Sequence, residues 1–295
     1  MALISAIWAN DYYSINKLIN SDLSPIGSDI VNQQNEFGTT PLIFAIREPN
    51  WHMPIIRMLL NHISIDVNIT DANQYNVLHY LMKHRDNSDY TREIYHLLIK
   101  KGININQQSS DGYTPLMIGL IYGLCNAEII KDLIDRQKDF NLIDKHHRNL
   151  LHHAIGFDFS KEQIEFCRML LERGVNINAC DDLGNTALSY FINTPALHGH
   201  HIYPIAPSLW QGPDFAPRDI ELVELLLSYN VNTFIKNTSD STAYDYAQAN
   251  MYNNVITAIN RQRWRLAIEA MLKGNYYFTV LPRDIREYIM LFGDQ

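Results

Sequence analysis

Polar turn segments and short apolar runs alternate along this chain, and the alternation repeats at a period in the thirties. Each copy passes from a polar segment into a run such as TPLMIGLIYG, and after a variable gap it reaches a second apolar patch such as IIKDLIDR. A fixed period of this length is typical of proteins that stack one small unit on the next. The copies start at Asn35, Asp71, Asp111, Asp144, Asp181 and Lys236, the last being the loosest.

One turn position favours glycine, and it is occupied in successive copies by Gly38, Gln74, Gly112, His147 and Gly184. Glycine takes a left-handed backbone conformation without a Cβ clash, so this position predicts a tight turn. The Thr two residues later can cap the first helix of the copy, and the Pro after it suits the first helical turn. Gly102 and Gly174 are placed to end the second helix of their copies.

Several copies depart from this pattern. The favoured glycine is replaced by Gln74, His147 and Ser239, the capping Thr by Asn76 and Asn149, and the Pro by Val77, Leu150 and Ala187. Asparagine still caps a helix, and histidine tolerates a positive φ better than glutamine does. Each departure should cost ~1 kcal/mol, so we expect the array to survive them.

The order of turn, helix, link and helix resembles the ankyrin repeat over roughly Ala2 to Asn260. The resemblance implies an all-α solenoid of about six to seven helix pairs, with the repeat array in residues 1–260 and a C-terminal helical cap in residues 261–295. The opening ALISAIWANDYYSINKLIN matches a first repeat without its turn. Its polar residues Asn10, Asp11, Asn16 and Lys17 would then form the solvated outer face of an end repeat.

The composition narrows the range of partners. The 295 residues carry a net charge of −8 at pH 7, with 19% charged and 46% hydrophobic residues, which is a globular balance. The densest basic cluster holds only Arg261, Arg263 and Arg265, so we expect no nucleic-acid partner. The sequence shows no signal peptide and no apolar window of membrane-spanning length. We therefore expect a monomer without a membrane role, cytoplasmic or secreted into the cytosol of a host cell.

The gaps between first and second helices vary, and the longest spans residues 193–219. This insertion is rich in Pro and His and carries Tyr203, Leu209, Trp210 and Phe215. A loop of this length in a compact array is usually functional or disordered, and exposed aromatics can anchor a partner. The alternative is that the aromatics fold back over neighbouring helices. Tyr203 and Trp210 are the partner-binding candidates on the insertion.

The turns and first helices form a second candidate surface. The residue after the glycine position is Thr39, Tyr75, Tyr113, Arg148 and Asn185 in successive copies. Tyr and Arg are frequent interface anchors, and the resemblance implies that these positions contact partners. The alternative is that each turn tyrosine only packs on the neighbouring turn. The predicted partner-binding residues here are Phe37, Tyr75, Tyr113, Tyr122, His146, Arg148 and Asn185.

Residues that resemble reaction chemistry are sparse. Histidines cluster at His198, His200 and His201, but no cysteine lies at ligand spacing, so we expect no metal site and no cofactor. Cys167 lies on the apolar side of a second helix, which predicts a buried structural thiol. Cys125, Cys167 and Cys180 lack CxxC spacing, which favours a reducing compartment. We predict that the protein is not an enzyme; a thiol or metal enzyme is the third alternative.

From Arg261 the repeat pattern stops. An amphipathic helix is predicted with Trp264, Ala267, Ile268, Met271 and Leu272 on one face. The later segment LPRDIREYI resembles the start of an F-box helix, the related C-terminal box of poxvirus ankyrin proteins, and the end of a SOCS box. The resemblance implies docking onto a cullin-type ubiquitin ligase through Leu281, Pro282, Ile285 and Ile289. The alternative is a cap that only covers the last repeat.

The sequence as a whole therefore predicts recognition of another protein by an ankyrin-repeat scaffold, as a bacterial or viral effector that binds a host protein. The alternative function is an adaptor that brings a bound target to a cullin-type ubiquitin ligase.

Overall fold

The computed structural model describes residues 2–20, 30–48, 52–84, 88–122, 127–155, 161–193 and 217–272. Within these residues the chain forms 14 helices and one isolated β-bridge, between Cys180 and Thr186, which confirms the predicted all-α solenoid of helix pairs. The chain divides into two compact units. Unit 1 comprises Met1–Asp158 with Glu172–Val175, and unit 2 comprises Phe159–Leu171 with Asn176–Gln295.

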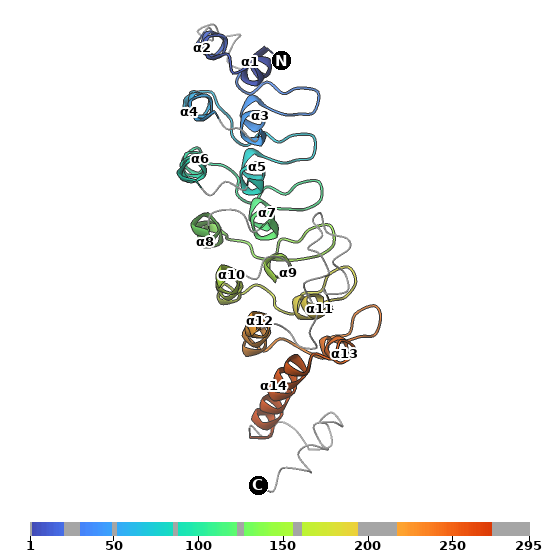
Figure 1. The fold of residues 1–295 in the computed structure, drawn as a ribbon. Coiled ribbons are helices and arrows are strands. Elements are labelled where there is room, and N and C mark those ends of the chain that lie inside the picture. The colour runs from blue at the N-terminus through green and yellow to red at the C-terminus, as the bar shows by residue number, and fades with distance from the viewer. Residues whose placement is uncertain are drawn as a thin grey trace. The chain divides into compact units, whose positions relative to one another are not determined.

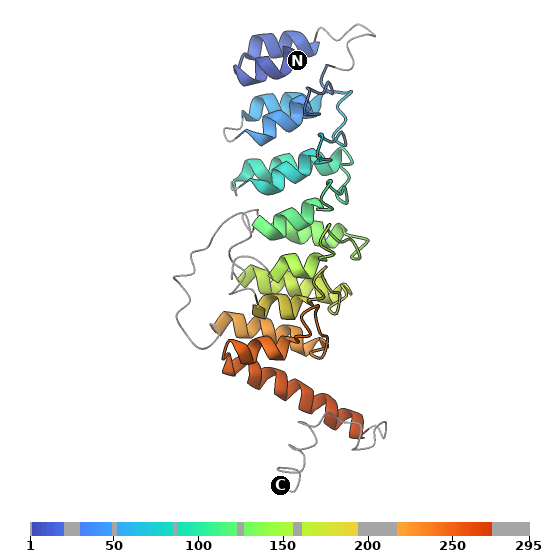
Figure 2. The ribbon, with the colours of Figure 1, turned by 90° about the vertical axis from the view of Figure 1, so that its right-hand side faces the viewer.

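Unit 1 contains two rows of helices (Figure 1). The first helices of successive repeats pack against one another: α1 with α3, α3 with α5, α5 with α7, and α7 with α9. The second helices form the other row, and the turns project from the first row on the side away from it (Figures 1 and 2). The bounds are α1 (Ala2–Trp8), α2 (Tyr12–Asn20), α3 (Pro41–Arg47), α4 (Met53–Asn61), α5 (Val77–Lys83), α6 (Asp89–Lys100), α7 (Pro115–Tyr122), α8 (Ala127–Arg136) and α9 (Leu150–Ile155).

The predicted left-handed turn residues are confirmed, since Gly38, Gln74, Gly112, His147 and Gly184 have φ values of 72°, 61°, 81°, 60° and 78°. At Gly112 a Cβ atom would lie 2.8 Å from Cα of Asp144, so the backbone of the next turn leaves no room for a side chain. This close approach lets the N–H of Lys145 donate to the carbonyl of Asp111 at 2.8 Å. The turns of unit 1 are thus joined backbone to backbone.

Helix caps follow the predicted pattern. Thr40 accepts a hydrogen bond from the N–H of Ile43, and Asn76 forms a capping box with His79 at the start of α5. Nε2 of His79 also lies 3.0 Å from the carbonyl oxygen of Tyr113 in the next repeat. Burial lowers the pKa of His79 to about 4, so the neutral ring donates this bond at physiological pH. One buried histidine therefore both caps its helix and joins two repeats.

The second helices are joined by exposed ion pairs between neighbouring repeats. Arg57 binds Glu93 at 2.6 Å, and Arg92 binds Glu128 at 3.0 Å. Because such pairs are solvated, each contributes little to the stability of the fold. Their regular spacing holds register between repeats, while the buried leucines and isoleucines of the two rows supply the main driving force.

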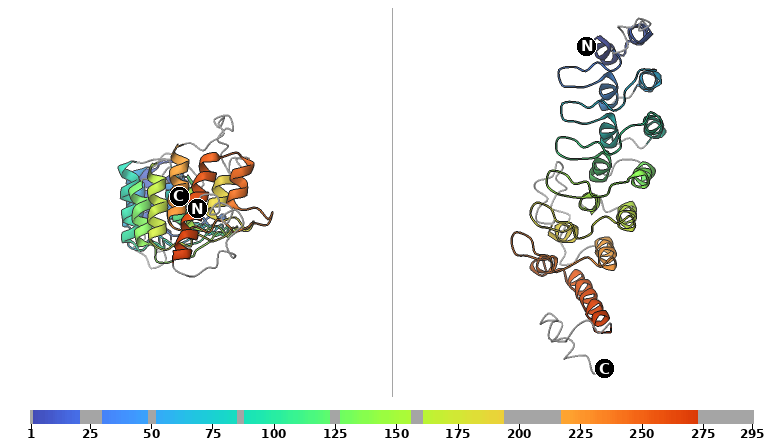
Figure 3. Two further views of the ribbon diagram at one scale, coloured as in Figure 1. Left: turned by 90° about the horizontal axis from the view of Figure 1, so that it is seen from below. Right: turned by 180° about the vertical axis from the view of Figure 1, so that it is seen from behind.

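Unit 2 contains the remaining helices, α10 (Lys161–Glu172, of which Glu172 groups with unit 1), α11 (Ala187–Asn193), α12 (Pro217–Ser228), α13 (Ala243–Ala249) and α14 (Asn253–Leu272). Helix α11 packs on α13, and α14 packs on both α12 and α13 (Figure 3). The left-handed residue of the last turn is Asp240, with φ of 58°, and not Ser239 as the sequence alignment of copies predicted. The carboxylate of Asp240 pairs with Lys236 at 2.8 Å across this turn.

Helix α14 differs from the helix predicted to begin at Arg261, because it starts at Asn253 and the proposed 260/261 boundary lies within it. Ala267 is buried as predicted, but Ile268 is 53% exposed, so its placement on the packed face is wrong. Polar residues take its place: the Gln262 amide donates to the carbonyls of Leu227 and Val231 at 3.1 Å each. These are carbonyls at and beyond the end of α12, which need partners when a helix terminus is buried.

Candidate protein-binding face

The candidate surface is the side of unit 1 on which the turns meet the first helices. We call it the turn face and define it by residues of these turns and helices: Trp8, Phe44, Arg47, Asp71, Tyr75, Tyr80, Lys83, Asp111, Tyr113, Tyr122, Asp144, Arg148 and His153. The turn supplies Asp71 and Tyr75 from one loop and Asp111 and Tyr113 from the next. A third turn supplies Asp144 and Arg148, and the first helices α1, α3, α5, α7 and α9 supply the others.

Two tyrosines and a lysine form the centre of the turn face. The rings of Tyr75 and Tyr80 lie 5.7 Å apart with a tilt of 57°. The Lys83 ammonium lies 4.2 Å from the centre of the Tyr75 ring and 5.6 Å from that of Tyr80. A cation above an aromatic ring is attracted by the negative face of the ring, so these three side chains hold one another in place.

Tyr80 joins helix α5 to the start of its own turn. Its hydroxyl donates to Oδ2 of Asp71, while Oδ1 of Asp71 accepts the N–H groups of Asn73 and Tyr75 at 2.9 Å each. Burial raises the pKa of Tyr80 above its usual range, and the bond and charge of Asp71 raise it further, whereas Arg47 lowers it. Arg47 of α3 therefore lies close to the Tyr80 hydroxyl, and the phenol stays protonated at all physiological pH values.

The next group is built around a buried carboxylate. Asp144 binds Nη2 of Arg148 at 2.7 Å and lies 3.2 Å from Nε2 of His153. Arg148 also donates from Nη2 to the Tyr113 hydroxyl at 2.9 Å, and the Tyr113 and His153 rings lie edge to face at 5.7 Å. Burial alone would raise the pKa of Asp144, but His153 and Arg148 together outweigh it and hold this pKa well below its usual range.

Tyr75 connects the two groups. Burial raises the pKa of its phenol, a hydrogen bond with Ser109 lowers it, and Asp111, Tyr113 and Tyr122 raise it slightly further. These neighbours come from the following repeat, so the predicted residues Tyr75, Tyr113 and Tyr122 lie in one cluster. Arg148 joins this cluster through its hydrogen bond to the Tyr113 hydroxyl, so four of the predicted contact residues lie together.

The remaining predicted residues differ from one another. Phe37 is 64% exposed at the tip of its turn, and His146 is half-buried. Arg148 and Asn185 are buried, with 8% and 3% exposure, because each binds the carboxylate at the start of its own turn. The predicted residues Tyr203, Trp210, Leu281, Pro282, Ile285 and Ile289, like Cys125, His198, His200 and His201, lie outside the described residues.

Sequence reasoning missed Tyr80, Lys83 and the turn acids. A signal for them exists in the sequence: an Asp or Asn at the start of a turn is followed nine residues later by a polar aromatic side chain. Asp71 contacts Tyr80, Asp144 contacts His153, and Asn237 donates to the Tyr246 hydroxyl at 2.5 Å. The interval is visible only once the copies are aligned and the pairing is known.

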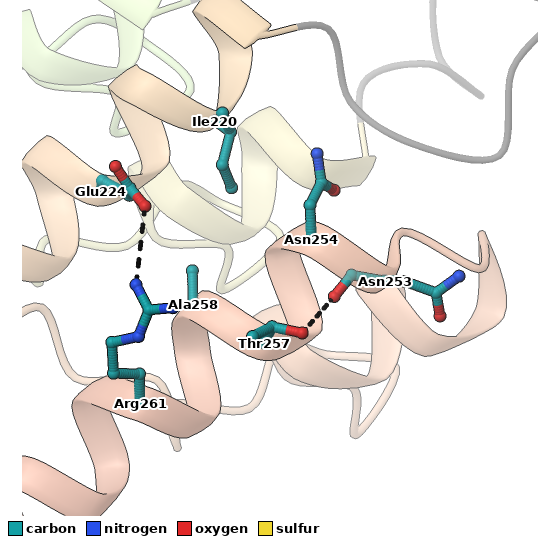
Figure 4. A pocket seen from close by; sticks show the side chains of 7 residues that line it. All are labelled: Ile220, Glu224, Asn253, Asn254, Thr257, Ala258 and Arg261. Carbon is teal, nitrogen blue, oxygen red and sulfur yellow. Dashed lines mark hydrogen bonds and ion pairs between the residues drawn. The ribbon is translucent and has the colours of Figure 1, made fainter.

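Unit 2 contains a hollow between α12 and α14 (Figure 4). Its lining residues are Ile220, Glu224, Asn253, Asn254, Thr257, Ala258 and Arg261. Arg261 and Glu224 are 4.0 Å apart and mostly exposed, and the Thr257 hydroxyl donates to the carbonyl of Asn253 at 2.8 Å. The hollow is lined by neither a histidine nor a cysteine.

The described part of the chain contains no cluster of three or more metal-ligating His, Cys, Asp or Glu residues, and none of its helices is long and apolar enough to cross a bilayer. Cys167 is fully buried, as predicted, and burial raises the pKa of its thiol to about 12. A thiol in that state is a packing element and not a nucleophile.

Stacked helix pairs joined by left-handed turns and backed by a second row of helices define a helical-repeat scaffold. A family model described as Ankyrin repeats (3 copies) matches residues 3–109 and 86–181. The chain therefore belongs to the ankyrin-repeat family. Its fold is also similar to the crystal structure of the ankyrin repeat domain of Bcl-3, with a TM-score of 0.62 and 20% identity, over 88% of this chain and 98% of that one.

Curated relatives include viral ankyrin repeat proteins. The chain is 28% identical over 181 residues to ankyrin repeat protein L371 of Acanthamoeba polyphaga mimivirus, which is 61% of this chain and 22% of that protein. It is 30% identical over 162 residues to ankyrin repeat protein OPG189 of Variola virus, covering 55% and 26% of the two chains. It is 33% identical over 138 residues to ankyrin repeat protein FPV034 of Fowlpox virus, covering 47% and 29%. The matched region is thus under a third of each relative.

Proposed function

We propose that this protein recognises another protein through the turn face of unit 1, as an effector acting on a host protein in the cytosol of the host cell. The observation that carries the proposal is the gathering of Tyr75, Tyr80, Tyr113 and Tyr122 from two first helices and two turns onto one face. Tyrosines of this kind supply large contact areas at low entropic cost and are enriched at interface hot spots. The similarity to viral ankyrin repeat proteins supports the host-directed part of the proposal.

The half-exposed state of these tyrosines also supports binding. Tyr75, Tyr113 and Tyr122 are each partly accessible, although Tyr75 is held by a hydrogen bond with Ser109 and Tyr113 by one from Arg148. Side chains that are already fixed lose little further freedom when a partner arrives. The turn face is therefore preorganised for a contact.

The test is capture of partners from a eukaryotic lysate with quantitative mass spectrometry. Tyr75→Ala and Tyr122→Ala together should reduce recovery of the specific partner at least tenfold, because two anchors of ~1 kcal/mol or more are lost. The matched control is Tyr90→Ala, which removes a 51% exposed tyrosine from the second helix α6. Equal recovery by the wild type and the double variant, both folded by circular dichroism, would contradict the proposal.

A second function rests on the segment LPRDIREYI, which lies outside the described residues. Its resemblance to F-box, poxvirus-box and SOCS-box helices supports an adaptor that recruits a cullin-type ubiquitin ligase while the repeats hold the target. Ile285→Asp should remove cullin subunits from the captured material. Ile268→Asp, on the exposed side of α14, is the matched control and should leave them bound. Absence of cullin subunits with the wild-type chain would leave the cap as the role of this segment.

A further inference from the structure

The acids around the tyrosine cluster are all engaged. Asp71 accepts the Tyr80 hydroxyl and two backbone N–H groups, and it is 7% exposed. Asp111 pairs with Lys145 at 2.8 Å. Asp144 pairs with Arg148 at 2.7 Å. Each of these three carboxylates thus already has a hydrogen-bonded or ionic partner within the protein.

Two cations on the turn face, Arg47 and Lys83, have no such ionic partner among the described residues. Among the described residues, neither Arg47 nor Lys83 lies within ion-pair distance of a carboxylate. Both lie beside Tyr80, Arg47 near its hydroxyl and Lys83 near its ring. Burial lowers the pKa of Lys83, and the attraction of Asp71 offsets this only in part. The lysine charge is therefore held where water solvates it poorly and the Asp71 carboxylate compensates it only in part.

The charges of this group do not cancel. Arg47 and Lys83 contribute two positive charges, and Asp71 contributes one negative charge, which leaves an excess of one positive charge beside Tyr80. One carboxylate would neutralise it, whereas a phosphate group with nearly two negative charges would leave an excess of the opposite sign. A basic segment would meet like charge. The complementary partner group is a single carboxylate.

An apolar surface continues from the two cations. The rings of Trp8 and Phe44 are 6.0 Å apart, and Trp8 is 70% exposed at the end of α1. Phe44 lies three residues before Arg47 in α3, so the two share one side of that helix. Phe44 is only 9% exposed, so Trp8 supplies most of the accessible apolar surface on this side of Arg47. An exposed tryptophan on the same side as a cation suits a surface that takes an apolar side chain and an acid together.

We propose that the turn face binds a protein segment in which an Asp or Glu stands close to a large apolar residue, the carboxylate meeting Arg47 and Lys83 and the apolar side chain packing on Trp8 and Phe44. This inference rests on the proposed function, because it names the chemistry of the partner for the same face. It goes further because it assigns charge specificity to Arg47 and Lys83, which form no ion pair with a carboxylate of the described residues.

The experiment is selection from a phage library of random twelve-residue peptides on the immobilised full chain. Peptides recovered with the wild type should be enriched about threefold or more in Asp and Glu next to Trp, Phe or Leu. Lys83→Gln should weaken these peptides about tenfold, since one charged contact is worth ~1.4 kcal/mol. Lys83→Arg should retain them. The matched control is Lys100→Gln, at the exposed end of helix α6, which should have no effect.

The outcomes separate the two proposals. Peptides that depend on Tyr75 but show no acidic bias, or that bind Lys83→Gln as well as the wild type, overturn the charge assignment and leave recognition by the turn face standing. Selection that recovers no peptide sensitive to Tyr75→Ala overturns both. Unchanged melting of each variant shows that any loss of binding is local.

Discussion

Asp144 in unit 1 and Asp181 in unit 2 occupy the same position in their turns, yet their pKa values are shifted in opposite directions. Each Oδ1 accepts two backbone N–H groups: those of His146 and Arg148 at 2.8 and 3.0 Å, and those of Leu183 and Asn185 at 3.0 and 2.7 Å. The pKa of Asp144 is held far below its usual range by His153 and Arg148 despite burial. Burial raises the pKa of Asp181 more than its hydrogen bonds lower it.

The difference comes from the side chains that reach each carboxylate, because His153 and Arg148 both approach Asp144, and the corresponding residues in the turn of Asp181 are Tyr190 and Asn185. Arg148 supplies a cation to Asp144, whereas Asn185 supplies only an amide to Asp181. The backbone of the turn is the same in both, because it depends on the left-handed residue and the cap. Ankyrin turns therefore leave the charge of the turn face free to vary, and unit 1 uses that freedom where the tyrosines gather.

The largest effect should come from Asp144→Asn. Arg148 and His153 would lose their buried anion, and we expect the free energy of unfolding to fall by about 3 kcal/mol. Asp181→Asn should change it by less than ~0.5 kcal/mol, because Asn237 already holds an equivalent turn in unit 2. Urea denaturation followed by circular dichroism measures both. Equal losses in the two variants would show that the cation at Arg148 is irrelevant.

A smaller effect is expected of Tyr80→Phe, which removes the hydroxyl donated to Asp71. The loss of a hydrogen bond to a charged group should cost about 1.5 kcal/mol. In the preceding repeat, Asn35 and Phe44 occupy the positions of Asp71 and Tyr80, and the Asn35 side chain still accepts the backbone N–H groups of its turn. The double variant Asp71→Asn with Tyr80→Phe should thus cost about 1 kcal/mol less than the sum of the single variants. Simple additivity would contradict a direct bond between them.

The smallest and most diagnostic effect is the pH dependence of the two aspartates. A lowered pKa stabilises the folded state above the unfolded value of about 4, so the advantage of the wild type over Asp144→Asn should shrink as the pH falls below that value. The raised pKa of Asp181 has the opposite effect on stability, because its charged form is less stable in the folded protein than in the unfolded chain. The wild type should lose stability relative to Asp181→Asn as the pH rises from about 4 toward the folded pKa. Stability curves of the same slope for both pairs would refute the comparison.

Much of the backbone followed from the sequence, including the helix pairs, the left-handed positions and the caps. The left-handed residue in the last copy was misplaced by one residue, since Asp240 and not Ser239 has the positive φ. Ile268 was expected on the packed side of α14, but Gln262 and Arg263 are buried there by hydrogen bonds to Leu227, Val231 and Thr233. A hydrophobicity pattern cannot detect burial of this kind, because carbonyl groups at a helix end drive it.

The residues of the candidate site also fall into those that the sequence predicted and those that it missed. Tyr75, Tyr113 and Tyr122 were predicted because they follow the repeat register. Tyr80 and Lys83 were missed because their roles depend on Asp71 and on ring contacts across the turn. Arg148 was predicted as a contact residue, but the structure buries it against Asp144.

The sequence by itself determined the repeating turn and helix pair, because left-handed glycines, capping side chains and apolar spacing act within a few residues of one another. Only the tertiary structure decided which turn charges are neutralised. Asp144 binds Arg148 and lies beside His153, whereas Arg47 and Lys83 form no ion pair with a carboxylate of the described residues. These contacts depend on side chains that come from separate elements and meet in a poorly solvated place. Interactions between residues near in sequence therefore determine the fold, whereas contacts between side chains of separate elements determine the charge of the turn face.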